Sequence, residues 1–139
     1  MRKFGLLLGV VVLALSAAGV AASSSEQHVK VALQPRNGSA VTGFVELTQL
    51  PSGGTNIHVN ARGLQPGHTY VSLYYDNHVC ELEPYSEDDV IGGPYTANRA
   101  GVGHTHGKVD DDLDEVNSVS VRDADTFALL ACADVHPGS

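Results

Sequence analysis

The sequence predicts an all-β domain, an antiparallel β-sandwich or barrel, and three observations support this. Apolar and polar residues alternate with a period of two along most of the chain, as they do in half-buried strands. Clusters of Gly, Pro, Asn and Ser separate these segments at short intervals. No segment has an apolar stripe with the 3.6-residue period of a helix over about ten or more residues. About seven short strands at this spacing are typical of a sandwich or barrel.

Each predicted strand begins where the alternation begins and ends at a turn. Val29, Val31 and Leu33 alternate with polar neighbours and precede a turn containing Asn37-Gly38, a strong hairpin signal. The later strands follow the same rule, and the third turns His58 toward solvent. The predicted strands cover residues 29–33, 41–47, 56–61, 69–75, 102–109, 116–121 and 127–135.

A long acidic segment without clear periodicity, residues 77–98, interrupts this series of strands. Segments of this length inside a compact domain are usually functional or mobile. We therefore expect a single β-sandwich domain over residues 23–139, with the acidic loop at about 77–98 as the surface that binds an unknown ligand or protein.

Residues 1–22 have the features of a signal peptide that is removed on export. Arg2-Lys3 is basic, Phe4–Leu15 is apolar, and small residues lead to Ala22. A membrane anchor needs roughly 20 apolar residues, so we expect no stable membrane span once the signal is removed. The predicted location is secreted, periplasmic or extracellular. Asn37-Gly38-Ser39 matches the N-glycosylation pattern, which only a eukaryotic secretory route would use.

Charge is distributed unevenly along the chain, and this excludes one class of partner. Residues 23–75 hold three basic and two acidic residues, whereas residues 76–139 hold three basic and fourteen acidic ones. A chain this acidic is repelled by phosphate backbones and by anionic lipid. We therefore expect no nucleic-acid partner. The oligomeric state stays open at this point.

The two cysteines, Cys80 and Cys132, are predicted to form one disulfide. An even pair in an exported protein is typical of a structural bridge. The two residues lack the C-x-x-C spacing of redox motifs, and two cysteines alone cannot build a thiolate zinc site.

The order of several short motifs resembles the copper/zinc superoxide dismutase family. Gly63-Leu64-Gln65-Pro66-Gly67 precedes a strand and then Asp76 and Cys80, and Leu129-Leu130-Ala131-Cys132 lies near the end of the chain. That family has G-L-x-P-G before its copper-ligand strand and pairs the following cysteine with a near-terminal R-L-A-C. The resemblance covers most of residues 28–80 and 116–136. It implies a Greek-key β-sandwich or barrel and a Cys80–Cys132 bridge.

The residues that carry the chemistry of that family do not match. Its copper-ligand strand has an H-x-H pair, whereas residues 69–74 contain no histidine, and Leu129 stands in the place of the arginine that guides the anion. The residues nearest to its other ligand positions are Tyr95, Asn98, Arg122 and Asp123. The sequence thus predicts a dismutase-like protein without an intact copper centre, with no catalytic residue assigned and a binding or structural role. Residual superoxide dismutase activity at a rearranged site is the alternative.

His104-Thr105-His106 is the one H-x-H of the chain and offers a second hypothesis. In a strand both imidazoles leave the same face and could hold copper or zinc. The alternative interpretation is that both histidines are solvated on the polar face and bind no metal, with Gly103, Thr105 and Gly107 turned toward the interior. Spacing identifies no third ligand.

The acidic run from Asp110 to Glu115 suggests calcium, which prefers carboxylate oxygens. The EF-hand template fails here, because Glu115 stands in place of its glycine and Val121 in place of its final glutamate. A looser calcium site at these acids or at residues 87–89 is one interpretation. A solvated charge run that keeps a sheet edge soluble is the other.

Overall fold

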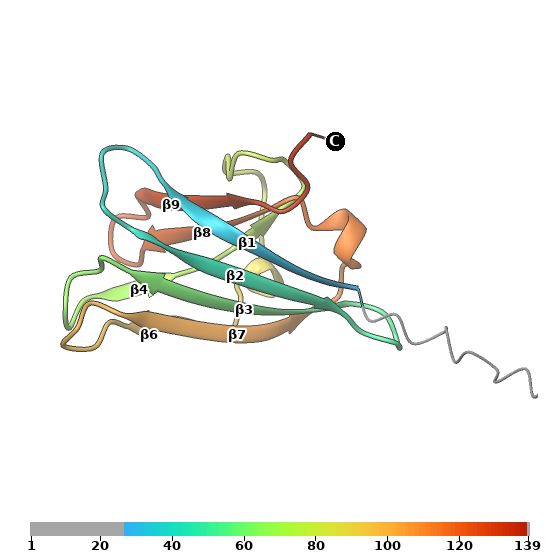
Figure 1. Ribbon diagram of the computed structural model, residues 1–139, viewed down its shortest axis with the longest axis horizontal. Helices are drawn as coiled ribbons and strands as arrows, with labels where there is room; N and C mark the ends of the chain where they lie inside the picture. Colours follow the sequence, from blue (N-terminus) through green and yellow to red (C-terminus); the bar gives the residue numbers. More distant parts are fainter. Residues whose placement is uncertain (1–26, 139) are drawn as a thin grey trace, which may run out of the picture.

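The computed structural model describes residues 27–138, which form nine strands and two short 3₁₀ helices, with no α-helix among them (Figure 1). The strands are β1 (His28–Pro35), β2 (Thr42–Gln49), β3 (Thr55–Arg62), β4 (Thr69–Val71), β5 (Tyr74–Tyr75), β6 (Tyr95–Thr96), β7 (Gly103–Val109), β8 (Ser118–Asp123) and β9 (Leu129–Asp134). The 3₁₀ helices are η2 (Glu87–Asp89) and η3 (Leu113–Glu115). The predicted signal peptide, residues 1–22, lies outside the described part. No helix within residues 27–138 has the length and apolar character needed to cross a bilayer.

All strand pairs are antiparallel, and their order is β6-β4-β8-β9-β1-β2-β3-β7, with β5 also paired to β8. The two end strands of this path, β6 and β7, contact each other. The sheet therefore curls into a nearly closed barrel, which Figure 1 shows with β1, β2, β3 and β7 side by side. This confirms the predicted all-β antiparallel fold.

In the long strands, buried and exposed side chains alternate in the way that the sequence predicts. On β3, Ile57, Val59 and Ala61 are fully buried, whereas His58 and Asn60 between them are exposed. Burying each aliphatic side chain contributes about 1.5–3 kcal/mol, so the period of two by itself selects the face that turns inward.

The predicted fourth strand is wrong in one respect, because the structure divides residues 69–75 between β4 and β5. Between them, the Ser72 carbonyl accepts a hydrogen bond from the Ile91 amide at 2.8 Å, and Leu73 forms a bridge with Val90. The returning acidic loop therefore supplies the backbone partners at this point, and the regular ladder stops.

That loop then runs along the inner side of β7. The Thr105 hydroxyl donates to the Ile91 carbonyl at 3.0 Å, and a Cβ on Gly107 would lie 2.7 Å from the Gly92 nitrogen. Since only a glycine fits at position 107, the loop and β7 are held in close contact.

Candidate functional site

The strand segment after the Pro66-Gly67 turn is packed on both of its faces. Tyr70 and Tyr74 belong to the main core. A second, smaller apolar cluster contains Val71, Leu73, Tyr75, Cys80 and Cys132. Every side chain of this segment that faces the second cluster is thus apolar or phenolic, and none offers an imidazole to a metal ion.

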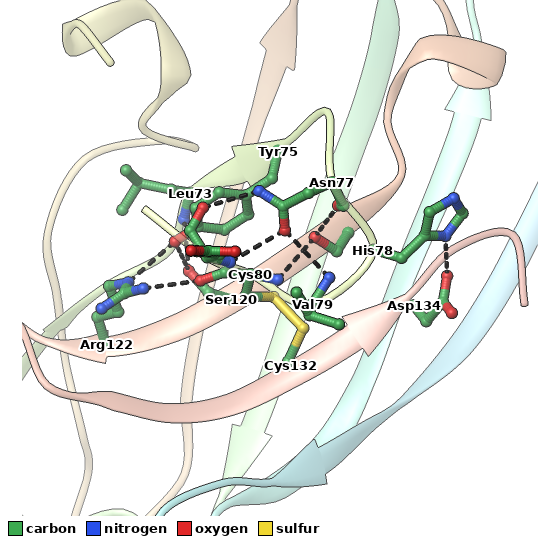
Figure 2. The surroundings of a disulfide bond; sticks show 12 residues. Leu73, Tyr75, Asn77, His78, Val79, Cys80, Ser120, Arg122, Cys132 and Asp134 are labelled. Atoms are coloured by element: carbon green, nitrogen blue, oxygen red, sulfur yellow. Dashed lines mark hydrogen bonds and ion pairs between the residues drawn. A yellow bond between two sulfur atoms is a disulfide. The ribbon is translucent and has the colours of Figure 1, made fainter. Parts of the chain in front are cut away.

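The disulfide predicted between Cys80 and Cys132 is confirmed. Their Cα atoms are 6.0 Å apart and both side chains are buried. The bridge joins the start of the acidic loop to the centre of β9, so the loop leaves the barrel from a fixed point (Figure 2).

Arg122, on β8, lies buried beside this disulfide with only 6% of its surface exposed. Its Nε donates to the Tyr75 hydroxyl at 2.9 Å, and one terminal nitrogen donates to the Cys80 carbonyl at 2.8 Å (Figure 2). The other terminal nitrogen donates to the Phe127 carbonyl, also at 2.8 Å. No carboxylate of the described residues forms an ion pair with it. Three of its five N–H groups thus donate to neutral oxygens, and the guanidinium also lies 5.4 Å from the centre of the Phe127 ring.

Two of the acceptors of Arg122 are residues with left-handed backbone. Cys80 has φ of 56° and Phe127 has φ of 62°, a region that disfavours both side chains. Arg122 therefore fixes the two turns on either side of the disulfide. The sequence placed Arg122 only near the family's late ligand position, because two of its acceptors, the Tyr75 hydroxyl and the Cys80 carbonyl, lie 47 and 42 residues away.

His104 and His106 are both exposed on the outer face of β7, as the alternation predicts. Gly103 and Thr105 are buried on the inner face, and Gly107 is pressed against the returning loop. The two imidazoles therefore point to solvent because the inner side of β7 has room only for small side chains.

A third imidazole, which the spacing along β7 did not reveal, lies beside them. His58 on β3 is the register partner of His106, and the two rings are stacked at 5.1 Å between centroids and 13° between planes. Asn60 is the partner of His104. The outward direction of His58 was predictable, but its strand partner, 48 positions further along the sequence, was not.

A concave acidic surface forms where the loop meets the β7–β8 connection. A cavity of about 260 Å³ is lined by Tyr74 and by four carboxylates, those of Asp76, Glu83, Asp89 and Asp111. Burial, followed by the charges of neighbouring carboxylates, raises the pKa of both Tyr74 and Asp111. The carboxylates thus repel one another in a partly dehydrated space.

Part of the adjoining acidic run, residues 110–115, has a structural role. Oδ1 of Asp112 accepts from the Gly54 amide at 2.8 Å and from the Gln49 side chain at 3.0 Å, and these bonds lower the pKa of Asp112. Ligand atoms of Asp112, Asp114 and Glu115 lie within 4.8 Å of one another. Oε1 of Glu115 likewise accepts from the Asp112 amide at 3.2 Å, so two of the three carboxylates already bond to protein donors.

A second group of three, within residues 27–138, closes the β8–β9 turn against the start of β4. Nε2 of His68 lies 2.7 Å from Oδ2 of Asp123, with Asp125 next to them. Hydrogen bonds from the Thr126 and Asp125 amides, with His68 adding to them, lower the pKa of Asp123. This arrangement is that of a tightly hydrogen-bonded turn.

Comparison with known proteins adds no family: no protein-family model and no curated protein matches this chain. The functional conclusion therefore rests on the side chains described above.

Proposed function

We propose that this protein is an exported β-barrel with a framework similar to that of the copper/zinc superoxide dismutases, without a copper centre, and that it acts by binding a cationic partner. Its binding surface is the acidic end, defined here as residues 76–89 together with Asp111. The observation that carries the proposal is the cavity in which three carboxylates of residues 76–89 and one from the β7–β8 connection converge.

The packing of the segment 69–75 supports a non-catalytic barrel. Val71 and Leu73 fill the positions on this strand that face the disulfide cluster, so a copper ion would have to displace buried apolar side chains. The nearest guanidinium, that of Arg122, is buried and bonded to three oxygens. It is therefore unavailable to attract an anion from solvent.

The acidic end is held in place before any partner arrives. Oε1 of Glu83 accepts from the Asp76 amide at 2.8 Å, and the Ser86 hydroxyl accepts from the Asp88 amide at 3.3 Å at the start of η2. A surface ordered in advance loses less conformational entropy on binding. This rigidity favours a recognition role over that of a merely solvating charge run.

A Lys- or Arg-rich segment of another protein is the partner that fits this surface. Most of the acidic residues lie after position 75, so the field of the acidic end attracts cations and accelerates their association. Burial and then repulsion by neighbouring carboxylates raise the pKa of Asp111, and a cation that enters relieves the repulsion.

Two neighbouring aspartates allow a charge-matched test. Asp111 lines the cavity and Asp110 does not, so Asp111→Asn and Asp110→Asn change the net charge equally. With a fluorescent Lys-rich peptide and anisotropy as the readout, we expect Asp111→Asn to raise Kd about fivefold, corresponding to about 1 kcal/mol. Asp110→Asn should change Kd by less than about twofold. Equal effects of the two would mean that net charge, and not the cavity, attracts the peptide.

The absence of dismutase activity is tested separately. Protein refolded with copper and zinc should dismute superoxide no faster than the free metal ions at the same concentration. Turnover clearly above that background would overturn the non-catalytic part of the proposal while leaving the peptide test unaffected.

The disulfide supports export, since such bridges persist in oxidising compartments and are rare in the cytosol. We infer that the mature chain is secreted, periplasmic or extracellular. Mass spectrometry of the protein from its own host should find a chain beginning near residue 23, and an intact N-terminus would contradict this.

A second candidate function, copper or zinc binding at His104 and His106, is favoured by one observation, the ring of His58 stacked on His106.

A further inference from the structure

Three histidines occupy adjacent positions on the outer face of two paired strands. His58 on β3 lies directly opposite His106 on β7, and His104 lies two residues before His106 on the same face. Residues two apart in a strand are separated by about 6.6 Å, and directly opposed residues have Cβ atoms about 5 Å apart. The three side chains therefore form a compact triangle, in which His58 and His104 are diagonal neighbours across the two strands.

The backbone beneath this triangle is rigid. β3 is paired on both sides, with β2 and with β7, over nearly its whole length. β7 is also tied to the returning loop by the bond from Thr105 to the Ile91 carbonyl and by the close approach of Gly107 to Gly92. Sites built on such strands hold their ligands more precisely than sites on loops.

The side chains have the freedom that the backbone lacks. All three histidines are exposed, so turning their rings breaks the stacking of His58 on His106 but displaces no buried side chain. The ring centroids of His58 and His106 are 5.1 Å apart. Two imidazoles bound to one tetrahedral ion at about 2.0–2.1 Å have their nitrogens about 3.3 Å apart and their centroids about 5 Å apart. Rotation of the side chains about their own bonds can therefore aim the nitrogens at a shared ion without movement of the strands.

The charges that face this triangle come from three strands. Glu46 on β2 is the register partner of His58, and its carboxylate also lies 3.7 Å from Lys30 and 3.9 Å from His28. Lys108 follows on the outer face of β7. A dication at the triangle would thus have a carboxylate on one side and an ammonium on the other, so the imidazole nitrogens must supply most of the binding energy.

We propose that His58, His104 and His106 together bind one divalent transition-metal ion, copper(II) or zinc, on the outer face of the barrel. Imidazole suits both ions, and at a given site copper(II) binds more tightly than zinc. Calcium and magnesium prefer oxygen ligands and are rejected by such a donor set. The site rests on the second candidate function, metal binding at His104 and His106, and completes it with His58 as the third ligand. It is independent of the cationic-partner function, because it uses different residues at a different surface.

His28 provides a matched control. It is an exposed histidine like the other three, but it lies on β1, separated from β7 by β2 and β3. The disulfide-bonded mature protein should bind one copper(II) or zinc ion per chain in isothermal titration, with copper the tighter, and no calcium at this surface. The variants His58→Ala and His106→Ala should each weaken metal binding at least tenfold. Loss of a residue that only hydrogen-bonds a metal ligand already lowers metal affinity about 10–100-fold. His28→Ala should change the affinity less than about twofold.

Two further measurements complete the test. The melting temperatures of the metal-free variants should equal that of the wild type, because all these side chains are exposed. NMR signals of the three histidine rings should broaden first when copper(II) is added in small amounts. Wild-type affinity in His58→Ala, an equal loss in His28→Ala, or one ion per two chains would each overturn the site. None of these results would alter the peptide binding at the acidic end, so the two proposals fail separately.

Discussion

The long-stranded half of the barrel, formed by β1, β2, β3 and β7, is held together differently from the half formed by β4, β5, β8 and β9. Strands in the first half are seven or eight residues long and pair in continuous register. In the second half β5 has two residues and β4 three, and the β8–β9 ladder shifts register at Val121/Arg122. Strand length and regular burial stabilise the first half, whereas the second half depends on a disulfide and a buried guanidinium.

This difference also divides the surface chemistry. In the first half the inward side chains form the apolar core, and imidazoles lie exposed on the outer face of β3 and β7. The second half uses its polar groups internally, and its acidic residues are concentrated in the loop and connection that adjoin it. Each proposed binding surface therefore belongs to one half, and the two should respond to different substitutions.

Removing the disulfide should have the largest effect. The bridge spans 52 positions of sequence, so the double variant Cys80→Ala, Cys132→Ala should lose about 4 kcal/mol of unfolding free energy by the loop-entropy relation. Urea denaturation measures the loss, and hydrogen exchange should show β5 and the acidic loop losing protection before β1–β3. Uniform loss of protection across the barrel would contradict the proposed difference between the two halves. Thiol labelling of the denatured wild type should find no free cysteine.

Removing the buried guanidinium should come next. Arg122→Met leaves three oxygens without their donors, and at about 1 kcal/mol or more for each the loss is about 3 kcal/mol. The matched control is Arg62→Met, an exposed arginine of the first half, which should shift the free energy by no more than about 0.5 kcal/mol. If the two variants unfold at the same urea concentration, the second half is held by its disulfide and apolar contacts alone.

Two adjacent aspartates should give smaller effects of opposite sign. The pKa of Asp112 is lowered in the folded protein by hydrogen bonds from Gly54 and Gln49, so its carboxylate stabilises the fold above the unfolded pKa of about 3.9. That contribution is lost as the pH falls through the folded pKa. Asp112→Asn should therefore lower the melting temperature at pH 7, and this effect should shrink as the pH falls below about 3.9.

The pKa of Asp111 is raised, mainly by burial. Its charged form is disfavoured in the folded state, and stability falls as the pH rises through the folded pKa. Asp111→Asn should therefore raise the melting temperature at pH 7. Both changes should be smaller than that of Arg122→Met. Shifts of the same sign in the two variants would show that charge number, and not the local contacts, decides their contribution.

The regular strands were predictable because alternation is a local property of the chain. Ile57, Val59 and Ala61 were expected to face inward and do so, and His104 and His106 were expected to share a face and do so. The break at Ser72–Leu73 was not predictable, since it arises from hydrogen bonds to the returning loop. The resemblance to the dismutase family remains a prediction that rests on turn and cysteine motifs.

The candidate sites could be predicted only in part. The acidic composition of the loop indicated a charged surface, but the cavity needs Asp111 to approach Asp76 and Asp89 from another connection. The H-x-H was visible in the sequence, but its partner His58 belongs to a strand that precedes it by more than 40 residues. Spacing along one strand carries no information about which strand lies next to it.

By itself the sequence determined the period of two, the single pair of cysteines, and the separation of an acidic second part from a nearly neutral first part. Each of these is a property of neighbouring residues or of composition. Only the tertiary structure decided that β3 pairs with β7, that Arg122 reaches the carbonyl of Cys80, and that carboxylates from different connections share one cavity. The physical reason is that strand pairing and loop closure bring together residues far apart in the chain, and their register depends on the packing of the whole barrel.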